Sequence, residues 1–400
     1  FFFALCISWA DHCSMDYLAF CGKTFDDSDE SDETSEADDA YLESFLSKPD
    51  PDLKPPADKP DRTPKPPPRR IQMHIRNPPF SVSPGPDVYS LSFNEDGQFL
   101  AASYSDSEVR VFSVAKGTVA YRFQINAKRA PATMIRFRPD PEGKKNVVLV
   151  GGANGELQLW HVTSKRCIYK TVEICDTTQE PNAIYAADYQ RNGKFLATAG
   201  MDTAVRVYDE VKHTVVQAFQ TDEVQGIRGH GNRVFAVKWH DQDHNLLLSG
   251  GWDRTVRVWD MRVPESVKTI FGPYICGHSL DVRGNTVLAG TCTSEEQCNL
   301  YDLRSCNRLR ILPLPIPDAD IFSCEFVSNM PECAAISGSK GLACVMDTTT
   351  GHIVGEEKCA TSAFCCSPHG GHHGTMVAFG CAGGYISCLA AQTKNPPFLT

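Results

Sequence analysis

The sequence predicts an all-β domain made of seven repeated sheet units behind a polar N-terminal tail. A strand-like segment that recurs at regular spacing carries this prediction, together with alternation of side chains along it. The 400 residues are 42 % hydrophobic, which is enough for a large core. The net charge of −10 is concentrated in residues 1–70, which hold 8 basic and 16 acidic residues. The remaining 31 basic and 33 acidic residues leave the domain itself close to neutral.

The recurring segments read EVRVFS, ELQLWH, AVRVYD, TVRVWD, CNLYDL, ACVMDT and YISCLA. Their aromatic or apolar marker residues lie 48, 48, 51, 42, 45 and 43 positions apart: Phe112, Trp160, Tyr208, Trp259, Tyr301, Met346 and Leu389. Within the fourth segment, Val256 and Val258 face away from Arg257, which is the period of a β-strand. This spacing is typical of four-stranded sheets repeated around an axis.

The fourth unit combines Gly229-His230, the run RVFAVKW and the stretch LLLSGGWDRTVRVWD. It resembles a complete WD repeat, and the chain is identified by it as a WD-repeat family member over about residues 71–391. The resemblance implies a seven-bladed WD-repeat β-propeller. It also implies a hydrogen-bonded structural tetrad of His230, Ser249, Asp253 and Trp259. A buried carboxylate and imidazole are tolerated only when such a network is fully connected.

We expect four regions along the chain. Residues 1–25 form an N-terminal edge, and residues 26–70 form a disordered tail that is acidic and then proline-rich. Residues 71–391 form the propeller, and residues 392–400 are a short C-terminal tail. A propeller must close on itself to avoid open sheet edges. The alternating segment 70–76 is therefore expected to supply the outer strand of the last blade.

The sequence indicates no catalytic residues, cofactor or metal. The histidine, serine and aspartate of the fourth unit belong to the tetrad, and no phosphate-binding loop is present. Most of the 17 cysteines stand singly in apolar runs, which predicts free buried thiols and a reducing compartment, the cytoplasm and/or nucleus. The near-neutral domain argues against nucleic acid as a partner. No segment predicts membrane insertion.

The resemblance implies that protein partners bind the top face, where each inner strand begins. We aligned the units on the later inner-strand residues Phe93, Phe137, Tyr189, Trp239, Val282, Phe326 and Cys366. This alignment brings seven residues to the top rim: Tyr89, Thr133, Tyr185, Phe235, His278, Phe322 and Ser362. Arg233 and Trp252 join Phe235 in the fourth unit. Aromatic and arginine side chains are enriched at interface hot spots, so we predict a partner-binding site here, within a larger complex.

Two short motifs leave an alternative function open. Trp259-Asp260-Met261-Arg262 and Tyr301-Asp302-Leu303-Arg304 resemble the WDxR motifs of substrate receptors for cullin–RING ubiquitin ligases. That resemblance implies adaptor binding through Arg262 and Arg304 on the bottom face.

Overall fold

The computed structural model describes residues 72–76, 80, 84–126, 130–140, 146–222, 224–371 and 374–391. The segments expected as an N-terminal edge, a disordered tail and a C-terminal tail lie outside these residues.

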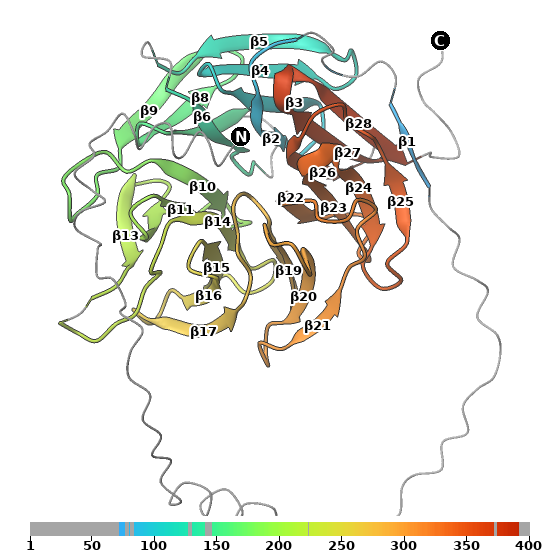
Figure 1. Cartoon of the computed structure of the whole chain (residues 1–400). Helices are drawn as coiled ribbons and strands as arrows, with labels where there is room; N and C mark the ends of the chain where they lie inside the picture. Colours follow the sequence, from blue (N-terminus) through green and yellow to red (C-terminus); the bar gives the residue numbers. More distant parts are fainter. Residues whose placement is uncertain are drawn as a thin grey trace, which may run out of the picture. The chain divides into compact units, whose positions relative to one another are not determined.

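The described residues form seven four-stranded antiparallel sheets around a central axis, so the predicted seven-bladed propeller is confirmed (Figure 1). Six blades take four consecutive strands, from the inner strand outward. Blade 1 contains β2 (Val88–Phe93), β3 (Phe99–Tyr104), β4 (Glu108–Ser113) and β5 (Thr118–Gln124). Blade 2 contains β6 (Ala132–Phe137), β7 (Val147–Gly152), β8 (Glu156–His161) and β9 (Arg166–Val172). Blade 3 contains β10 (Ile184–Tyr189), β11 (Phe195–Gly200), β12 (Val205–Asp209) and β13 (Thr214–Phe219).

The second half of the chain continues the same order. Blade 4 contains β14 (Val234–Trp239), β15 (Leu246–Gly251), β16 (Thr255–Asp260) and β17 (Ser266–Phe271). Blade 5 contains β18 (Leu280–Arg283), β19 (Thr286–Gly290), β20 (Cys298–Asp302) and β21 (Arg308–Ile311). Blade 6 contains β22 (Ile321–Phe326), β23 (Cys333–Gly338), β24 (Ala343–Asp347) and β25 (Ile353–Glu356). Blade 7 contains β26 (Ala363–Gly371), β27 (Gly374–Cys381) and β28 (Ile386–Ala391).

The weak sixth and seventh repeats form complete sheets. The turn between the second and third strands is a single 3₁₀ turn in each, η2 (Ser339–Gly341) and η3 (Ala382–Gly384). Blade 5 is the least regular, because its inner and outer strands are each only four residues long. A four-stranded blade therefore forms even where the residues by which a repeat is recognised in the sequence are missing.

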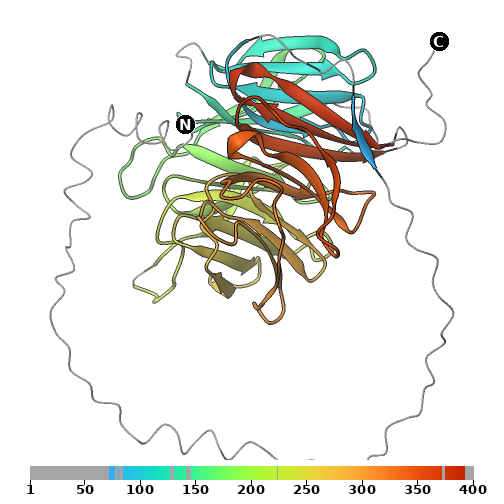
Figure 2. The same cartoon turned by 45° about the vertical axis from the view of Figure 1, so that its right-hand side comes forward.

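The last blade is completed by β1 (Met73–Ile75), which comes from the start of the domain. This strand pairs antiparallel with β28, and Ile75 lies opposite Leu389. Figure 2 shows this first strand beside the three strands of the C-terminal blade. The outer strand and the three inner strands of blade 7 thus come from opposite ends of the domain.

The core consists of apolar layers between neighbouring blades. Between blades 3 and 4, for example, Val205 and Val207 share a buried cluster with Val237 and Trp259. Each sheet is packed on both faces, so β14 is buried or nearly so along its whole length. The outer strand β13 is mostly exposed. The inner strands consequently read as near-continuous apolar runs, with clear alternation mainly farther out.

The closing strand is expected to contribute strongly to stability. Met73 is 5 % exposed and lies in a buried cluster with residues of blades 6 and 7, including Val345 and Phe379. Met73→Ala should lower the free energy of unfolding by about 2–3 kcal/mol, because it removes buried methylene groups and leaves a cavity. Denaturant titration measures the change. The exposed neighbour His74, changed to alanine, is the matched control, and equal losses in both variants would contradict the proposed role of Met73.

Candidate functional site

A backbone bulge fixes the top end of six inner strands. In each of these blades the register shifts across one residue near the start of the strand. The bulged residues are Tyr89, Thr133, Tyr185, Phe235, Phe322 and Phe364. A bulge leaves one residue unpaired and re-aims its side chain. Repeated around the axis, it brings one side chain per blade to the same level.

Aromatic contacts connect these bulged residues around the axis. Tyr185 stacks on Phe235 with ring centroids 4.6 Å apart, and Phe364 contacts both Tyr89 and Phe322. In blade 5, His278 occupies the corresponding level, just before β18. Its Nε2 lies 2.8 Å from the carbonyl oxygen of Tyr185, two blades away. These side chains therefore close the top of the central channel.

The predicted rim position in blade 7 is wrong. The alignment placed Ser362 there, but Cys366 pairs with Phe379, which puts Phe364 at the bulge. The error arose because β26 is nine residues long, so the end of the strand is a poor anchor. The register in which β26 pairs with the second strand, β27, identifies Phe364 as the bulged residue.

The channel below these aromatic residues is filled by charged side chains. Lys238 Nζ lies 2.5 Å from Glu325 Oε1 and 3.5 Å from Asp281 Oδ1. Asp281 also accepts a hydrogen bond from the backbone N–H of Phe326 in the next blade, and Asp188 does the same for Trp239. The cavity beside Lys238, His278 and Glu325 measures only about 10 Å³, room for about one water molecule. This cavity therefore has no space for an organic ligand.

The structural tetrad of blade 4 is a continuous chain of hydrogen bonds. Trp259 Nε1 donates to Ser249 Oγ over 2.7 Å, and Ser249 Oγ lies 2.7 Å from His230 Nε2. His230 Nδ1 lies 2.8 Å from Asp253 Oδ2. Burial lowers the pKa of His230, and the bond to His230 helps to lower the pKa of Asp253 to about 2 despite its partial burial. A neutral imidazole beside an ionised carboxylate satisfies every donor in this chain.

Burial makes this set unsuitable for nucleophilic catalysis. Ser249 is 0 % exposed and its hydroxyl accepts the indole N–H, so no substrate carbonyl can approach it. The tetrad instead ties the loop that enters blade 4 to the turn at Asp253. It also orders that turn, because Asp253 accepts hydrogen bonds from the backbone N–H of Gly231 and of Thr255.

Blade 3 has a replacement for the tetrad histidine that the repeat pattern does not reveal. Thr198 Oγ1 and the Tyr208 hydroxyl donate to Glu173 Oε1 over 2.6 and 2.9 Å. Asn182 and Arg206 contact the other oxygen. Burial raises the pKa of Glu173, although the four neighbours oppose that shift. The missing GH dipeptide of this repeat is thus compensated by a carboxylate from the preceding loop.

The turn of blade 4 holds Trp252 in a fixed position at the top face. Its backbone N–H donates to the carbonyl of Arg233 over 3.0 Å. A Cβ atom at Gly251 would lie 2.1 Å from that same carbonyl oxygen, so only glycine allows the approach. The Trp252 ring rests against Phe235, with centroids 5.0 Å apart, and the Arg233 guanidinium lies 5.3 Å from the Trp252 centroid.

Two further residues, Tyr274 and Arg254, join this group in the structure. Tyr274, in the loop between blades 4 and 5, stacks on Trp252 at 6.3 Å, and the Arg254 guanidinium lies 5.6 Å from its ring. Both residues were missed in the sequence, because neither lies at a repeat position that was compared. Arg233, Trp252, Arg254 and Tyr274 are all at least partly exposed, and we call them the blade-4 mouth.

The residues predicted for partner binding separate into two groups. Arg233, Trp252, Tyr185, Phe322 and His278 keep some exposed surface. Phe235 and Tyr89 are only 1 % and 4 % exposed, so they support neighbouring side chains instead of presenting a surface.

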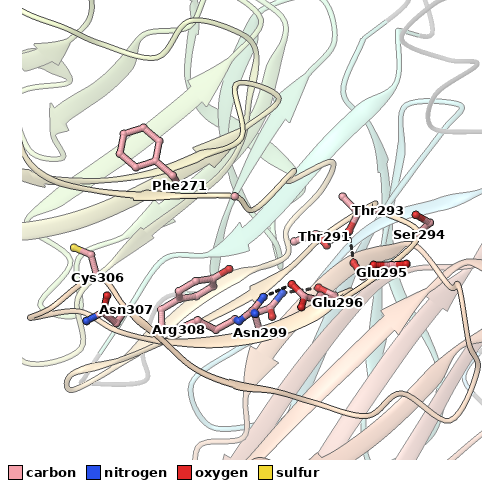
Figure 3. Close-up of a pocket in the computed structure, with 12 residues that line it drawn as sticks. Phe271, Thr291, Thr293, Ser294, Glu295, Glu296, Asn299, Cys306, Asn307 and Arg308 are labelled. Atoms are coloured by element: carbon pink, nitrogen blue, oxygen red, sulfur yellow. Dashed lines mark hydrogen bonds and ion pairs between the residues drawn. The ribbon is translucent and has the colours of Figure 1, made fainter. Parts of the chain in front are cut away.

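A groove continues from the mouth along the side of blade 5. Its cavity is about 490 Å³, and Figure 3 shows Phe271 on one side and the loop residues Thr291 to Glu296 on the other. Phe271 is 77 % exposed and precedes Tyr274 by three residues. An Arg308–Glu296 ion pair crosses the floor of the groove. The groove and the mouth adjoin at Gly272, which lines the groove and donates its backbone N–H to the Arg254 carbonyl over 2.9 Å.

The two arginines of the WDxR-like motifs lie in turns that follow the third strands of blades 4 and 5. Arg262 is exposed, and its Nε donates to Asp260 Oδ1 over 2.8 Å. Arg304 Nε donates to Asn285 Oδ1 over 3.1 Å. Both side chains are accessible and are engaged in local contacts.

Two sequence families match the chain, and both describe WD repeats. The "WD domain, G-beta repeat" family matches residues 173–209 and 221–260, and the "Anaphase-promoting complex subunit 4 WD40 domain" family matches residues 80–140. The first match contains the tetrad of blade 4 and the Glu173 network of blade 3. The chain contains WD repeats within residues 173–260, and its described residues fold as a seven-bladed β-propeller.

Similar curated proteins are also WD-repeat proteins or subunits of complexes. The propeller is 25 % identical over 191 residues to WD repeat-containing protein 25 of Mus musculus, covering 48 % of this chain and 32 % of that protein. It is 28 % identical over 165 residues to Cell division cycle 20.1, cofactor of APC complex, of Arabidopsis thaliana, covering 41 % and 32 %. It is 27 % identical over 94 residues to Histone acetyltransferase type B subunit 2 of Neurospora crassa, covering 23 % and 21 %. The WD-repeat propeller thus matches a third or less of the length of these relatives.

These comparisons support WD repeats in this chain, and two of the similar proteins are named as a cofactor or a subunit of a larger complex. Within the described residues, no helix is long and apolar enough to cross a bilayer. The same part of the chain has no group of three or more His, Cys, Asp or Glu side chains arranged for a metal ion.

The channel histidine predicts a pH-dependent stability. Burial and the positive charge of Arg136 lower the pKa of His278 to about 4, and the bond to Tyr185 only partly offsets them. Below about pH 6.5 the His278 imidazole is protonated in the unfolded chain but stays neutral in the folded chain. The free energy of unfolding therefore falls as the pH is lowered. His278 alone should lower the free energy of unfolding by about 2 kcal/mol between pH 7.5 and pH 5.

His278→Phe is the natural test, because phenylalanine occupies the corresponding level in blades 4, 6 and 7. The difference in unfolding free energy between pH 7.5 and 5, measured by denaturant titration, should shrink by about 2 kcal/mol in this variant. The exposed His352, changed to phenylalanine, serves as control and should behave like the wild type. An unchanged pH dependence in His278→Phe would rule out the assignment.

Proposed function

We propose that this chain is a non-catalytic scaffold that binds a peptide segment or a domain of another protein on the top face of blade 4. The observation that carries this proposal is the blade-4 mouth, where Trp252 is fixed by its backbone and packed between Phe235, Arg233 and Tyr274. Tryptophan, tyrosine and arginine are the residues most enriched in interface hot spots. Here they occur together at one accessible site.

Pre-organisation of the mouth favours a recognition role. The Arg233 carbonyl fixes the Trp252 backbone, the tetrad fixes the neighbouring turn, and stacking restricts the rings. Side chains held in this way lose little conformational entropy when a partner binds. The groove beside Phe271 then provides room for the partner chain to continue across blade 5.

The remaining features agree with a scaffold. The serine, histidine and aspartate set is buried, and the channel is filled, so neither supplies an active site. Two similar proteins are described as a cofactor of the APC complex and as a subunit of a histone acetyltransferase, which supports protein partners and a role as a subunit of a larger complex. The 14 described cysteines are all free thiols, which supports the cytoplasm and/or nucleus as the compartment.

Trp252→Ala should reduce partner recovery at least about tenfold, because it removes the central side chain of the mouth. Affinity purification of tagged full-length chain, followed by quantitative mass spectrometry, measures this loss. The double variant Arg262→Ala/Arg304→Ala is the control, and its partners should be unchanged. Thermal unfolding of each variant checks that the propeller stays folded.

Full retention of partners by Trp252→Ala would disprove the top-face proposal. Loss of a ligase adaptor from the double variant alone would instead favour the cullin–RING alternative.

A further inference from the structure

The blade-4 mouth and the strands beneath it carry four arginines. Arg233 and Arg254 belong to the mouth, while Arg228 precedes blade 4 and Arg257 lies in its third strand, where its Nη1 donates to the Arg228 carbonyl. Among the residues that the structure describes, none of these four forms an ion pair with a carboxylate. Asp253 is the acidic neighbour of Arg257, but its oxygens already accept bonds from His230, Gly231 and Thr255. The carboxylate of Asp253 offsets one of these four positive charges, and the four arginines together with Asp253 keep a net positive charge.

The two central guanidinium groups are held by aromatic rings. Arg233 lies over Trp252 and Arg254 lies over Tyr274, at 5.3 and 5.6 Å. A guanidinium that stacks on a ring keeps the N–H donors at its edge available for bidentate bonds to a carboxylate. Stacking also fixes its orientation, so less entropy is lost when such bonds form. The two arginines thus present donors in a prepared geometry.

Arg254 occupies a backbone conformation that favours glycine. Its φ is +58°, and the corresponding turn residues of blades 2, 6 and 7 are glycines with φ of +76°, +78° and +82°. In blades 1, 3 and 5 the position is taken by Ser107, Thr203 and Glu296, also with positive φ. A non-glycine residue in this region carries a modest conformational cost. The positive φ at this turn is a property of the repeat, and glycine is the residue that adopts it with the least strain.

We propose that the blade-4 mouth binds an acidic peptide segment, with aspartate or glutamate carboxylates on Arg233 and Arg254. This inference rests on the proposed top-face function and specifies the chemistry of its ligand. Arg228 and Arg257 extend the positive potential toward blade 3, and burial together with the charge of Arg228 lowers the pKa of Arg257 despite the opposing effect of Asp253. An acidic ligand relieves this repulsion between like charges.

An acidic peptide fits the surface better than a nucleic acid does. The patch is confined to one blade and its neighbouring loop, whereas a duplex requires a long basic surface. Acidic residues follow along the top face on the blade-5 side, with Glu295 and Glu296 in blade 5 and Asp320 before blade 6. These carboxylates repel a long polyanion such as a phosphate backbone, and they confine a short acidic segment to the blade-4 mouth.

The test uses the full-length chain and a fluorescein-labelled peptide, GSEDEEYEDEG, with fluorescence anisotropy as the readout. A peptide with glutamine and asparagine in place of the acids is the neutral control. The acidic peptide should bind, its affinity should fall as salt rises from 50 to 300 mM, and the neutral peptide should bind at least about tenfold more weakly.

Arg254→Gly is the sharpest variant, because it removes the guanidinium at a position where glycine is the least strained residue. It should unfold at the same temperature as the wild type or higher, yet bind the acidic peptide at least about tenfold more weakly. Arg233→Glu/Arg254→Glu should abolish binding of the acidic peptide. Arg283→Glu is the matched control, since Arg283 also stacks on an aromatic ring, Phe326, but at the far end of an inner strand. It should bind the peptide like the wild type.

Equal affinity for the acidic and neutral peptides, or for the wild type and Arg254→Gly, would overturn the proposal. So would binding that requires phosphoserine in place of the acids, or binding of a 12-base-pair DNA duplex that competes with the peptide. If Trp252→Ala loses cellular partners while Arg254→Gly keeps them, the top-face function stands and the acidic-ligand inference fails. If both variants keep every partner, both proposals fail.

Discussion

Each sheet of this propeller is apolar on two faces, so no blade can bury its own surface without a neighbour on either side. The layers that join Val205 and Val207 of one blade to Val237 and Trp259 of the next repeat this arrangement around the axis. All fourteen faces of the seven blades are buried only if the first and last blades also pack against each other. The pairing of β1 with β28 meets this requirement, and every other property of the molecule depends on it.

Closure around an axis turns small local features into a shared surface. A one-residue bulge near the start of an inner strand would be a minor irregularity in an isolated sheet. Repeated in six blades, it gathers Tyr185, Phe235, Phe364 and their counterparts into an aromatic layer over a charged channel. The blade-4 mouth is built at the edge of this layer, where the tetrad and Gly251 hold Trp252 outward. The proposed recognition site on the top face therefore depends on the buried groups beneath it.

The fold could be predicted from the sequence because repetition is visible without any knowledge of contacts. The spacing of residues such as Phe112, Trp160 and Trp259 reports the number of blades even where a repeat has lost its dipeptides. Trp252 and Arg233 were also predictable, because they stand beside the one complete repeat. Phe364 was not, since two adjacent cysteines in β26 offer no aromatic anchor for alignment. Tyr274 and Arg254 were missed for another reason: a ring and a cation from different loops meet only after the blades have packed. Glu173 shows the same limit within the core, where a carboxylate from a preceding loop replaces a histidine.

The strand exchange at the closure also has a consequence for biosynthesis. Ile75 leaves the ribosome long before its partner Leu389, 314 residues later. At translation rates of about 5–20 residues per second, roughly 15–60 s pass between the synthesis of β1 and that of its pairing partner β28. During that interval six blades can emerge and pack, while Met73 and the exposed face of blade 1 remain without cover. Translation thus imposes an order on folding in which the first strand of the propeller is the last to join its sheet.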